Sequence, residues 1–129
     1  MQEITCDFLI KMDDKNNLID LTYLNEISDG SNELIHDLIH LFFVQIPEYQ
    51  AALNDLHDKK DWFNLGRMAH KAKAAILMVG MQELAQELKK LEENAKEEKN
   101  IHEYKEIIVK FVRDSNAAIK ELQEIKNKL

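Results

Sequence analysis

The 129-residue chain has one cysteine, one proline and three glycines, and none of its hydrophobic runs approaches the roughly 20 residues that a membrane-spanning helix needs. The single cysteine, Cys6, cannot form a disulfide within the chain. A reducing, cytoplasmic setting is the simplest interpretation. The first residues, MQEITCDFLIKMDD, lack the apolar core and the cleavage pattern of a secretion signal, so we expect a protein that is neither exported nor inserted in a membrane.

Positive charge is also scarce, since 17 Lys and Arg residues face 24 Asp and Glu residues and the formal net charge is −7. An acidic chain is repelled by nucleic-acid phosphates and by anionic lipid headgroups, so we expect neither as a partner. The length fits a single domain over residues 1–129 with its own hydrophobic core. Because glycine and proline are few, the chain has few places to turn, which favours long helices.

Apolar residues recur at helical spacing along most of the chain, and no segment shows the alternation of a β-strand. We expect a short helix capped by Asp20 and closed by Gly30, with an apolar stripe of Leu21, Leu24 and Ile27. Ser31 opens a second helix that runs to about residue 56 and contains Pro47. Proline inside a helix removes a hydrogen bond and costs about 3 kcal/mol, so we expect a kink there, or two helices in near continuity.

Three more helices follow. Asp61 caps the third, which ends at the turn glycine Gly80, and the fourth runs from about Gln82 to Lys99. Asn100 caps a long last helix whose narrow apolar seam is Tyr104, Ile108, Phe111, Ser115, Ala118, Leu122, Ile125 and Leu129. The short turns predict an all-α fold, an antiparallel four-helix bundle with a short N-terminal helix and a long C-terminal helix.

The third helix presents an unusual face around His70, which lies about 140° from the centre of the apolar stripe and so points away from the deepest core. Its neighbours on the helix surface are Phe63, Gly66, Lys73, Ala74 and Leu77. An exposed face ordinarily carries Glu, Lys and Gln, whereas this one combines aromatic, aliphatic and very small residues. Glycine inside a helix costs roughly 1 kcal/mol relative to alanine, a loss easier to accept if something approaches the backbone closely. The pattern indicates a surface built for access.

The chemistry open to His70 is nucleophilic. A neutral imidazole is a competent nucleophile near neutral pH, especially if its other nitrogen donates a hydrogen bond that fixes the tautomer. If the third and fourth helices form a hairpin about Gly80, Glu92 or a neighbouring residue comes near His70. Lys71 and Lys73 then offer positive charge to any anion that the histidine receives. A lone histidine on a helix is more often a solvated residue, and it is the surrounding residues that favour function.

The stretch AHKAKAAILMVGMQELAQELKKLE resembles the histidine-containing phosphotransfer (HPt) domain of bacterial phosphorelays. The family pattern has a phosphorylated histidine, a lysine three residues on, a glycine at the fourth place and another glycine ten residues after the histidine. His70, Lys73 and Gly80 match, while Ala74 replaces the fourth-place glycine. The upstream residues are also similar, with a short first helix, a mid-helix proline and an aspartate that opens the histidine helix. The resemblance is strongest over residues 19–96.

This resemblance implies a phosphoryl carrier rather than an enzyme. His70 would accept a phosphoryl group from the aspartate of one receiver domain and pass it to another, with Glu92 orienting the ring and Lys71 and Lys73 compensating charge. The docking surface would consist of Phe63, Gly66, Ala74 and Leu77. The implied partners are receiver domains of response regulators or a hybrid sensor histidine kinase. The chain itself would need no cofactor or metal, because Mg²⁺ belongs to the receiver.

Two other functions compete with the carrier. Glu33 and His36 form an E-x-x-H pair, with His40 one turn on, as in di-iron bundles, but that architecture needs a second such pair, which the sequence lacks. A non-catalytic helical interaction module is the more serious alternative, because the seam of the last helix could pair with a partner helix. We expect this helix to complete its own bundle instead. An exposed His70 would favour the carrier.

Overall fold

The computed structural model describes residues 19–128, so Cys6 and Leu129 lie outside the described residues. Between these limits the elements are helical: α2 (Thr22–Ile27), α3 (Asn32–Asp58), α4 (Trp62–Met78), α5 (Gln82–Glu97), the 3-10 helix η1 (Ile101–Glu103) and α6 (Tyr104–Lys128). The predicted all-α bundle with a short N-terminal and a long C-terminal helix is confirmed. None of the helices in this range is long and apolar enough to cross a bilayer.

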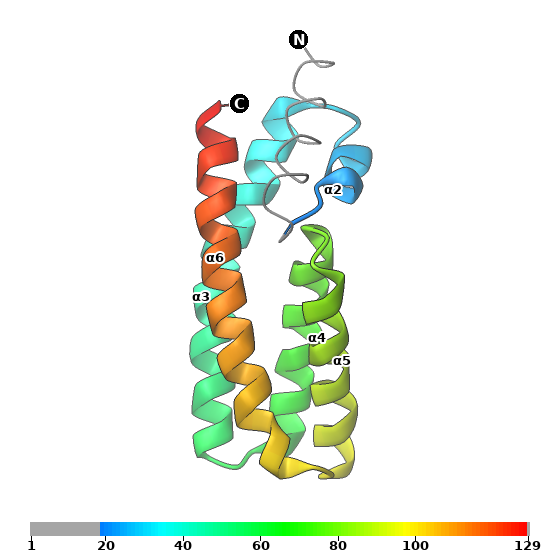
Figure 1. The fold of residues 1–129 in the computed structure, drawn as a ribbon, viewed down its shortest axis with the longest axis vertical. Helices are drawn as coiled ribbons and strands as arrows, with labels where there is room; N and C mark the ends of the chain where they lie inside the picture. Colours follow the sequence, from blue (N-terminus) through cyan, green and yellow to red (C-terminus); the bar gives the residue numbers. More distant parts are fainter. Residues whose placement is uncertain (1–18, 129) are drawn as a thin grey trace.

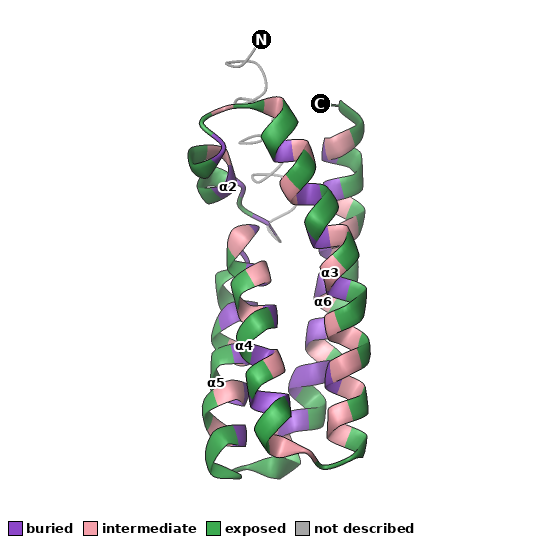
Figure 2. Cartoon of the chain, turned by 180° about the vertical axis from the view of Figure 1, so that it is seen from behind, coloured by how far each residue is buried: buried purple, intermediate pink, exposed green. Residues whose placement is uncertain are grey.

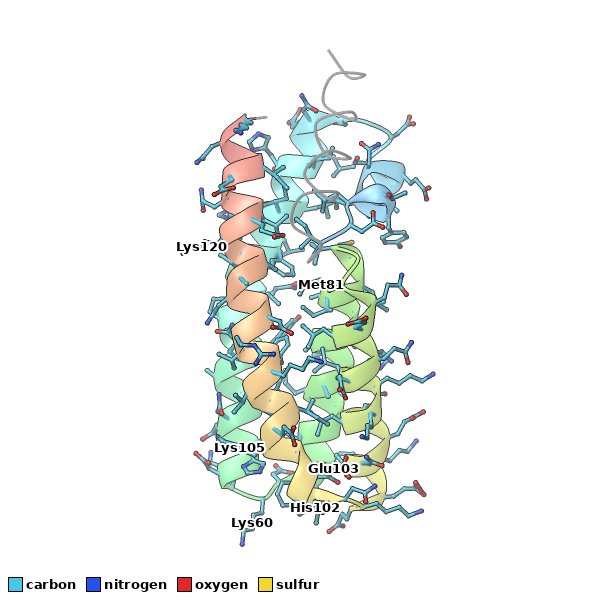
Figure 3. All side chains as sticks on the ribbon, in the orientation of Figure 1. Lys60, Met81, His102, Glu103, Lys105 and Lys120 are labelled. Carbon is cyan, nitrogen blue, oxygen red and sulfur yellow. The ribbon has the colours of Figure 1, made fainter. Side chains whose placement is uncertain are left out.

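The four long helices run antiparallel to their neighbours along the chain (Figure 1). α3 and α6 lie side by side, and the shorter α4–α5 hairpin packs against one half of their length. The turns before α4 and before α6 lie at the same end of the bundle, where Lys60 and His102 are seen, whereas Met81 marks the opposite turn of the hairpin (Figure 3). α2 lies beyond that turn, at the end of the bundle where α3 begins and α6 ends (Figure 1).

Buried residues face inward along all four long helices (Figure 2). The seams predicted for α5 and α6 are buried throughout the described residues, from Leu84 to Ala95 and from Tyr104 to Ile125. Two predictions are wrong, because Ile27 and Leu34 are 42% and 40% exposed. Ile27 is the last residue of α2 and does not reach the core, and in α3 the next residue, Ile35, takes the inward position with 0% exposure.

Local capping chemistry determines the starts of α3 and α4. Ser31 and Asp61 accept hydrogen bonds from the backbone N–H three residues on, each at 3.2 Å, as predicted. Leu21, and not Asp20, holds the N-cap position of α2, but Oδ1 of Asp20 accepts a hydrogen bond from the backbone N–H of Thr22, the first residue of α2. α6 does not begin directly after Asn100, because that residue is left-handed, with φ 54°, and its carbonyl first closes the single turn of η1.

α3 continues as one α-helix through Pro47, so the expected break into two helices is wrong. Pro47 is exposed, on a face where water can compensate for the missing backbone N–H. The helix bounds do not show the expected kink, which stays a prediction.

The turn between α4 and α5 also holds the segment that precedes α2. Gly80 has a φ of 75°, as suits a glycine that follows a helix. The backbone N–H of Asp20 donates to the carbonyl of Val79 at 2.8 Å, and a Cβ added at Gly80 would collide with the Asp20 backbone. Gly80 therefore permits both the turn and the direct contact that fixes α2 on the hairpin.

We predict that Gly80→Ala lowers the free energy of unfolding by about 3 kcal/mol or more, because it adds a collision with Asp20 to the strain of a positive φ. Urea unfolding followed by circular dichroism measures the change. Gly30→Ala is the matched control, since Gly30 has a similar φ of 73° in the α2–α3 turn. Equal losses for the two variants would show that the contact with Asp20 contributes nothing.

Candidate functional site

His70 projects from the flank of the bundle. It lies near the middle of α4, and its side chain is 62% exposed. The neighbouring Ala69 and Ala72 are fully buried and hold this part of α4 against the core. The ring is therefore reachable from solvent while its backbone is fixed by packing on the opposite side of the helix.

α4 and α5 approach each other closely at Gly66. This glycine is buried, and a Cβ added there would lie 3.2 Å from the backbone oxygen of Glu92 and 3.4 Å from the Cβ of Ala95. We expected the close approach at Gly66 to come from another molecule, but it comes from α5 of the same chain. This close approach places Glu92 of α5 beside His70, which lies one turn after Gly66 on α4.

Glu92 bridges two side chains of α4. Its Oε2 lies 3.0 Å from Nδ1 of His70, and its Oε1 accepts a hydrogen bond from Nζ of Lys73, also at 3.0 Å. An ionised carboxylate can only accept hydrogen bonds, so Nδ1 carries the hydrogen in this contact. When the imidazole is neutral, the other nitrogen, Nε2, then keeps its lone pair. The hairpin prediction that Glu92 or a neighbouring residue comes near His70 is confirmed, and the residue is Glu92.

The surroundings of Glu92 keep it ionised. Partial burial alone would raise the pKa of its carboxyl group, but the hydrogen bond and charge of Lys73, together with His70, outweigh burial. The net effect is a pKa below the usual value of 4.5. The ammonium group of Lys73 is thereby engaged with Glu92, and a role in compensating phosphoryl charge stays a prediction.

A groove of about 370 Å³ opens beside His70 on the α4–α5 flank. Its lining is Phe63, Gly66, Arg67, His70, Lys71, Glu92 and Lys96. Sequence reasoning placed Lys71 near the histidine but missed Arg67 and Lys96. Each lies one helical turn from a predicted site residue, three before His70 and four after Glu92, so the i, i+3 and i, i+4 spacing could have found them.

The residues predicted for docking fall on two sides of His70. Phe63 is 67% exposed and lies at the groove just described. Ala74 and Leu77 line a second groove, of about 730 Å³, which α4 shares with Tyr23 of α2. Exposed apolar side chains thus flank the histidine in both directions along α4.

The residues of the metal alternative lie elsewhere, on α3, where Glu33 and His40 are exposed. Across residues 19–128, no group of three or more His, Cys, Asp or Glu side chains is arranged to hold a metal ion.

Comparison with known protein families matches residues 37–127 to the Hpt domain. The chain belongs to the Hpt domain family. The match extends through α6, beyond the range over which the sequence resemblance was strongest. Neither the curated proteins nor the solved structures contain a significant match. As an Hpt domain, the chain is a phosphotransfer intermediate of a phosphorelay rather than an enzyme, and domains of this family typically interact with receiver domains.

We predict that Lys73→Met raises the pKa of Glu92, because burial continues to favour the neutral acid when the ammonium group is gone. An NMR titration of the Glu92 carboxyl carbon measures the change. Lys71→Met is the control, since it removes an equal charge at a lysine whose side chain makes no hydrogen bond or ion pair with Glu92 in the described structure.

The lowered pKa of Glu92 determines how the stability of the fold changes with pH. At pH values above the usual carboxyl pKa of 4.5, ionised Glu92 stabilises the fold. This contribution is lost as the pH falls through the lower pKa that Glu92 has in the folded protein. A Glu92 titration midpoint above 4.5 in the unmodified protein would contradict the ion-pair geometry.

Proposed function

We propose that this Hpt domain carries a phosphoryl group on Nε2 of His70, taken from the aspartyl phosphate of one receiver domain and passed to the aspartate of another. The observation that supports this most directly is the bond from Nδ1 to Glu92 in a ring whose side chain is 62% exposed. Nδ1 is held by Glu92, and Nε2 is left for a partner to reach. We place the exchange in the cytoplasm.

The transfer uses few groups of this chain. The lone pair of Nε2 attacks phosphorus, the Nε2–P bond forms, and the bond from phosphorus to the aspartate oxygen breaks, so that the carboxylate leaves. The ring gains positive charge in this step, and Glu92 stabilises it through the hydrogen bond at Nδ1. A ring that keeps its Nδ1 proton is also a good leaving group when the phosphoryl group moves on. Mg²⁺ and its acidic ligands belong to the receiver.

Docking would use the exposed apolar side chains on either side of the histidine. Phe63 lies towards the start of α4, and Ala74 and Leu77 lie towards its end, so a partner that covers all three also covers the ring. Lys71 adds positive charge next to His70. Because this contact surface is small and partly polar, binding is expected to be weak enough for release between transfers.

The alternative of a helical interaction module has less support. It relied on an unpaired seam along the last helix, but the seam residues from Tyr104 to Ile125 are buried within the bundle. The expectation that α6 completes its own bundle is confirmed for the described residues.

We predict that His70→Gln abolishes phosphoryl uptake from a phosphorylated receiver domain, because it removes the nucleophile and leaves the helices unchanged. Radiolabel transfer measures uptake, and circular dichroism measures helical content. His40→Gln serves as the control, since His40 is an exposed histidine on α3. Undiminished uptake by His70→Gln would refute the assignment.

We also predict that Leu77→Ala slows uptake from a receiver about tenfold while uptake from the small donor phosphoramidate is unchanged, because only the receiver needs the docking surface. Leu77 is 40% exposed and lies outside the groove that holds His70. Val109→Ala is the matched control, as Val109 is 53% exposed but lies on α6. If both donors slow equally in Leu77→Ala, Leu77 acts on the site itself and not on docking.

A further inference from the structure

The lysine expected to compensate phosphoryl charge is already engaged. Nζ of Lys73 lies 3.0 Å from Oε1 of Glu92, and the Lys73 side chain is only 20% exposed. The positive charge of Lys73 and the negative charge of Glu92 offset each other. A phosphoryl group carries a charge of about −1.5 to −2 near neutral pH, so its counter-charge has to come from other residues.

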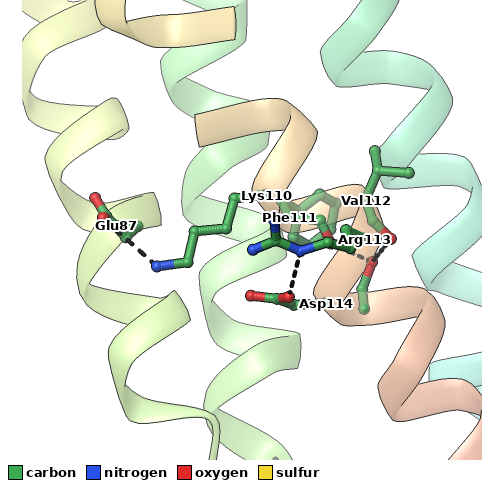
Figure 4. A network of polar contacts seen from close by, with 7 residues as sticks. Glu87, Lys110, Phe111, Val112, Arg113 and Asp114 are labelled. Atoms are coloured by element: carbon green, nitrogen blue, oxygen red, sulfur yellow. Dashed lines mark hydrogen bonds and ion pairs between the residues drawn. The ribbon is translucent and has the colours of Figure 1, made fainter. Parts of the chain in front are cut away.

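The groove beside His70 contains three further cations, Arg67, Lys71 and Lys96. Within the described residues, none of the three forms an ion pair with a carboxylate. On the α5–α6 side of the bundle, by contrast, Lys90 lies 2.9 Å from Glu103, and Lys110 lies 3.8 Å from Glu87 (Figure 4). In a chain with a net charge of −7, a group of cations left without carboxylates around one imidazole indicates an anion site.

The groove also suits the anion in size and in rigidity. Its volume of about 370 Å³ leaves room for a phosphoryl group on Nε2 and for part of the group that donates it. The guanidinium of Arg67 lies over the ring of Phe63, 5.8 Å from its centroid, which limits the positions that Arg67 can adopt. Lys96 projects from α5, opposite the α4 residues, so the groove offers positive charge from both helices.

We propose that Arg67 and Lys96, with Lys71, form the seat of the phosphoryl group on His70, and that Lys73 is a positioning residue that acts through Glu92. This inference rests on the proposed function. Arg67 and Lys96 contact the phosphoryl oxygens as the Nε2–P bond forms, and they lower the energy of the transferring group by opposing its charge. Lys73 instead holds the carboxylate that fixes the tautomer of the ring.

The experiment uses phosphoramidate as the donor, because it needs no docking surface. Nε2 attacks phosphorus, the P–N bond of phosphoramidate breaks, and its nitrogen leaves as ammonia. Loading of the full chain is followed by ³¹P NMR for Arg67→Gln and Lys96→Gln. The matched control is Lys120→Gln, which removes the same charge from α6, away from the α4–α5 hairpin (Figure 3). We expect each groove variant to load roughly three- to tenfold more slowly than the control, and Lys96→Arg to retain the normal rate.

A second measurement reports on the phosphorylated state. Nearby cations favour the dianion, so removal of Arg67 or Lys96 raises the second pKa of the phosphoryl group by about half a unit, seen as a shifted ³¹P titration. Lys73→Met changes this titration little and instead alters the ¹⁵N shifts that report the tautomer of His70. Circular dichroism of each variant verifies the fold.

The outcomes separate the two proposals. If the unmodified chain loads at His70 but Arg67→Gln and Lys96→Gln load and titrate like Lys120→Gln, the seat is wrong and the carrier function stands. If Lys73→Met raises the phosphoryl pKa as much as the groove variants are expected to, Lys73 contacts the phosphoryl group directly and its positioning role is wrong. If the unmodified chain does not load at His70, the proposed function fails as well.

Discussion

The geometry of the site depends on how closely α4 and α5 approach each other at Gly66. A Cβ added at Gly66 would lie only 3.2 Å from the backbone oxygen of Glu92 and 3.4 Å from the Cβ of Ala95. A Cβ at position 66 would require the neighbouring backbone of α5, at Glu92, to move by a few tenths of an ångström. Glycine inside a helix costs about 1 kcal/mol, and here it permits the close contact of α4 and α5 that places Glu92 beside the His70 ring.

The same helix pair holds two separate groups of charges beside His70. Glu92 lies between Lys73 and the exposed His70, and contacts with both side chains fix the orientation of its carboxylate. Arg67, Lys71 and Lys96, which have no carboxylate partner among the described residues, lie outside this pair, at the groove. An acidic chain thus presents a locally positive surface beside the exposed His70. This arrangement favours an anionic group there without attracting polyanions to the rest of the molecule.

Much of the fold could be predicted from the sequence because its causes are local. The spacing of the apolar residues predicts each helix. The side chains of Ser31 and Asp61 cap α3 and α4 by accepting hydrogen bonds from backbone N–H groups only three residues further along the chain. The predictions that failed concern helix ends. Asp20 does not hold the N-cap position of α2, and its backbone is bonded to the turn after α4, while Asn100 adopts a left-handed conformation that delays the start of α6. Ile27 has helical spacing, yet α2 ends before it can reach the core.

For the site itself, the sequence determined which face of α4 carries His70, and counting residues from the turn at Gly80 placed Glu92 or a neighbouring residue near it. Helical periodicity and hairpin counting suffice for this, because both depend only on distance along the chain. Only the tertiary structure decided that Gly66 faces α5, that Lys73 is engaged with Glu92, and that Arg67 and Lys96 meet in one groove. These features depend on the separation and the rotation of two packed helices. Side chains at the helix–helix interface fix both quantities, and the periodicity of a single helix does not predict them.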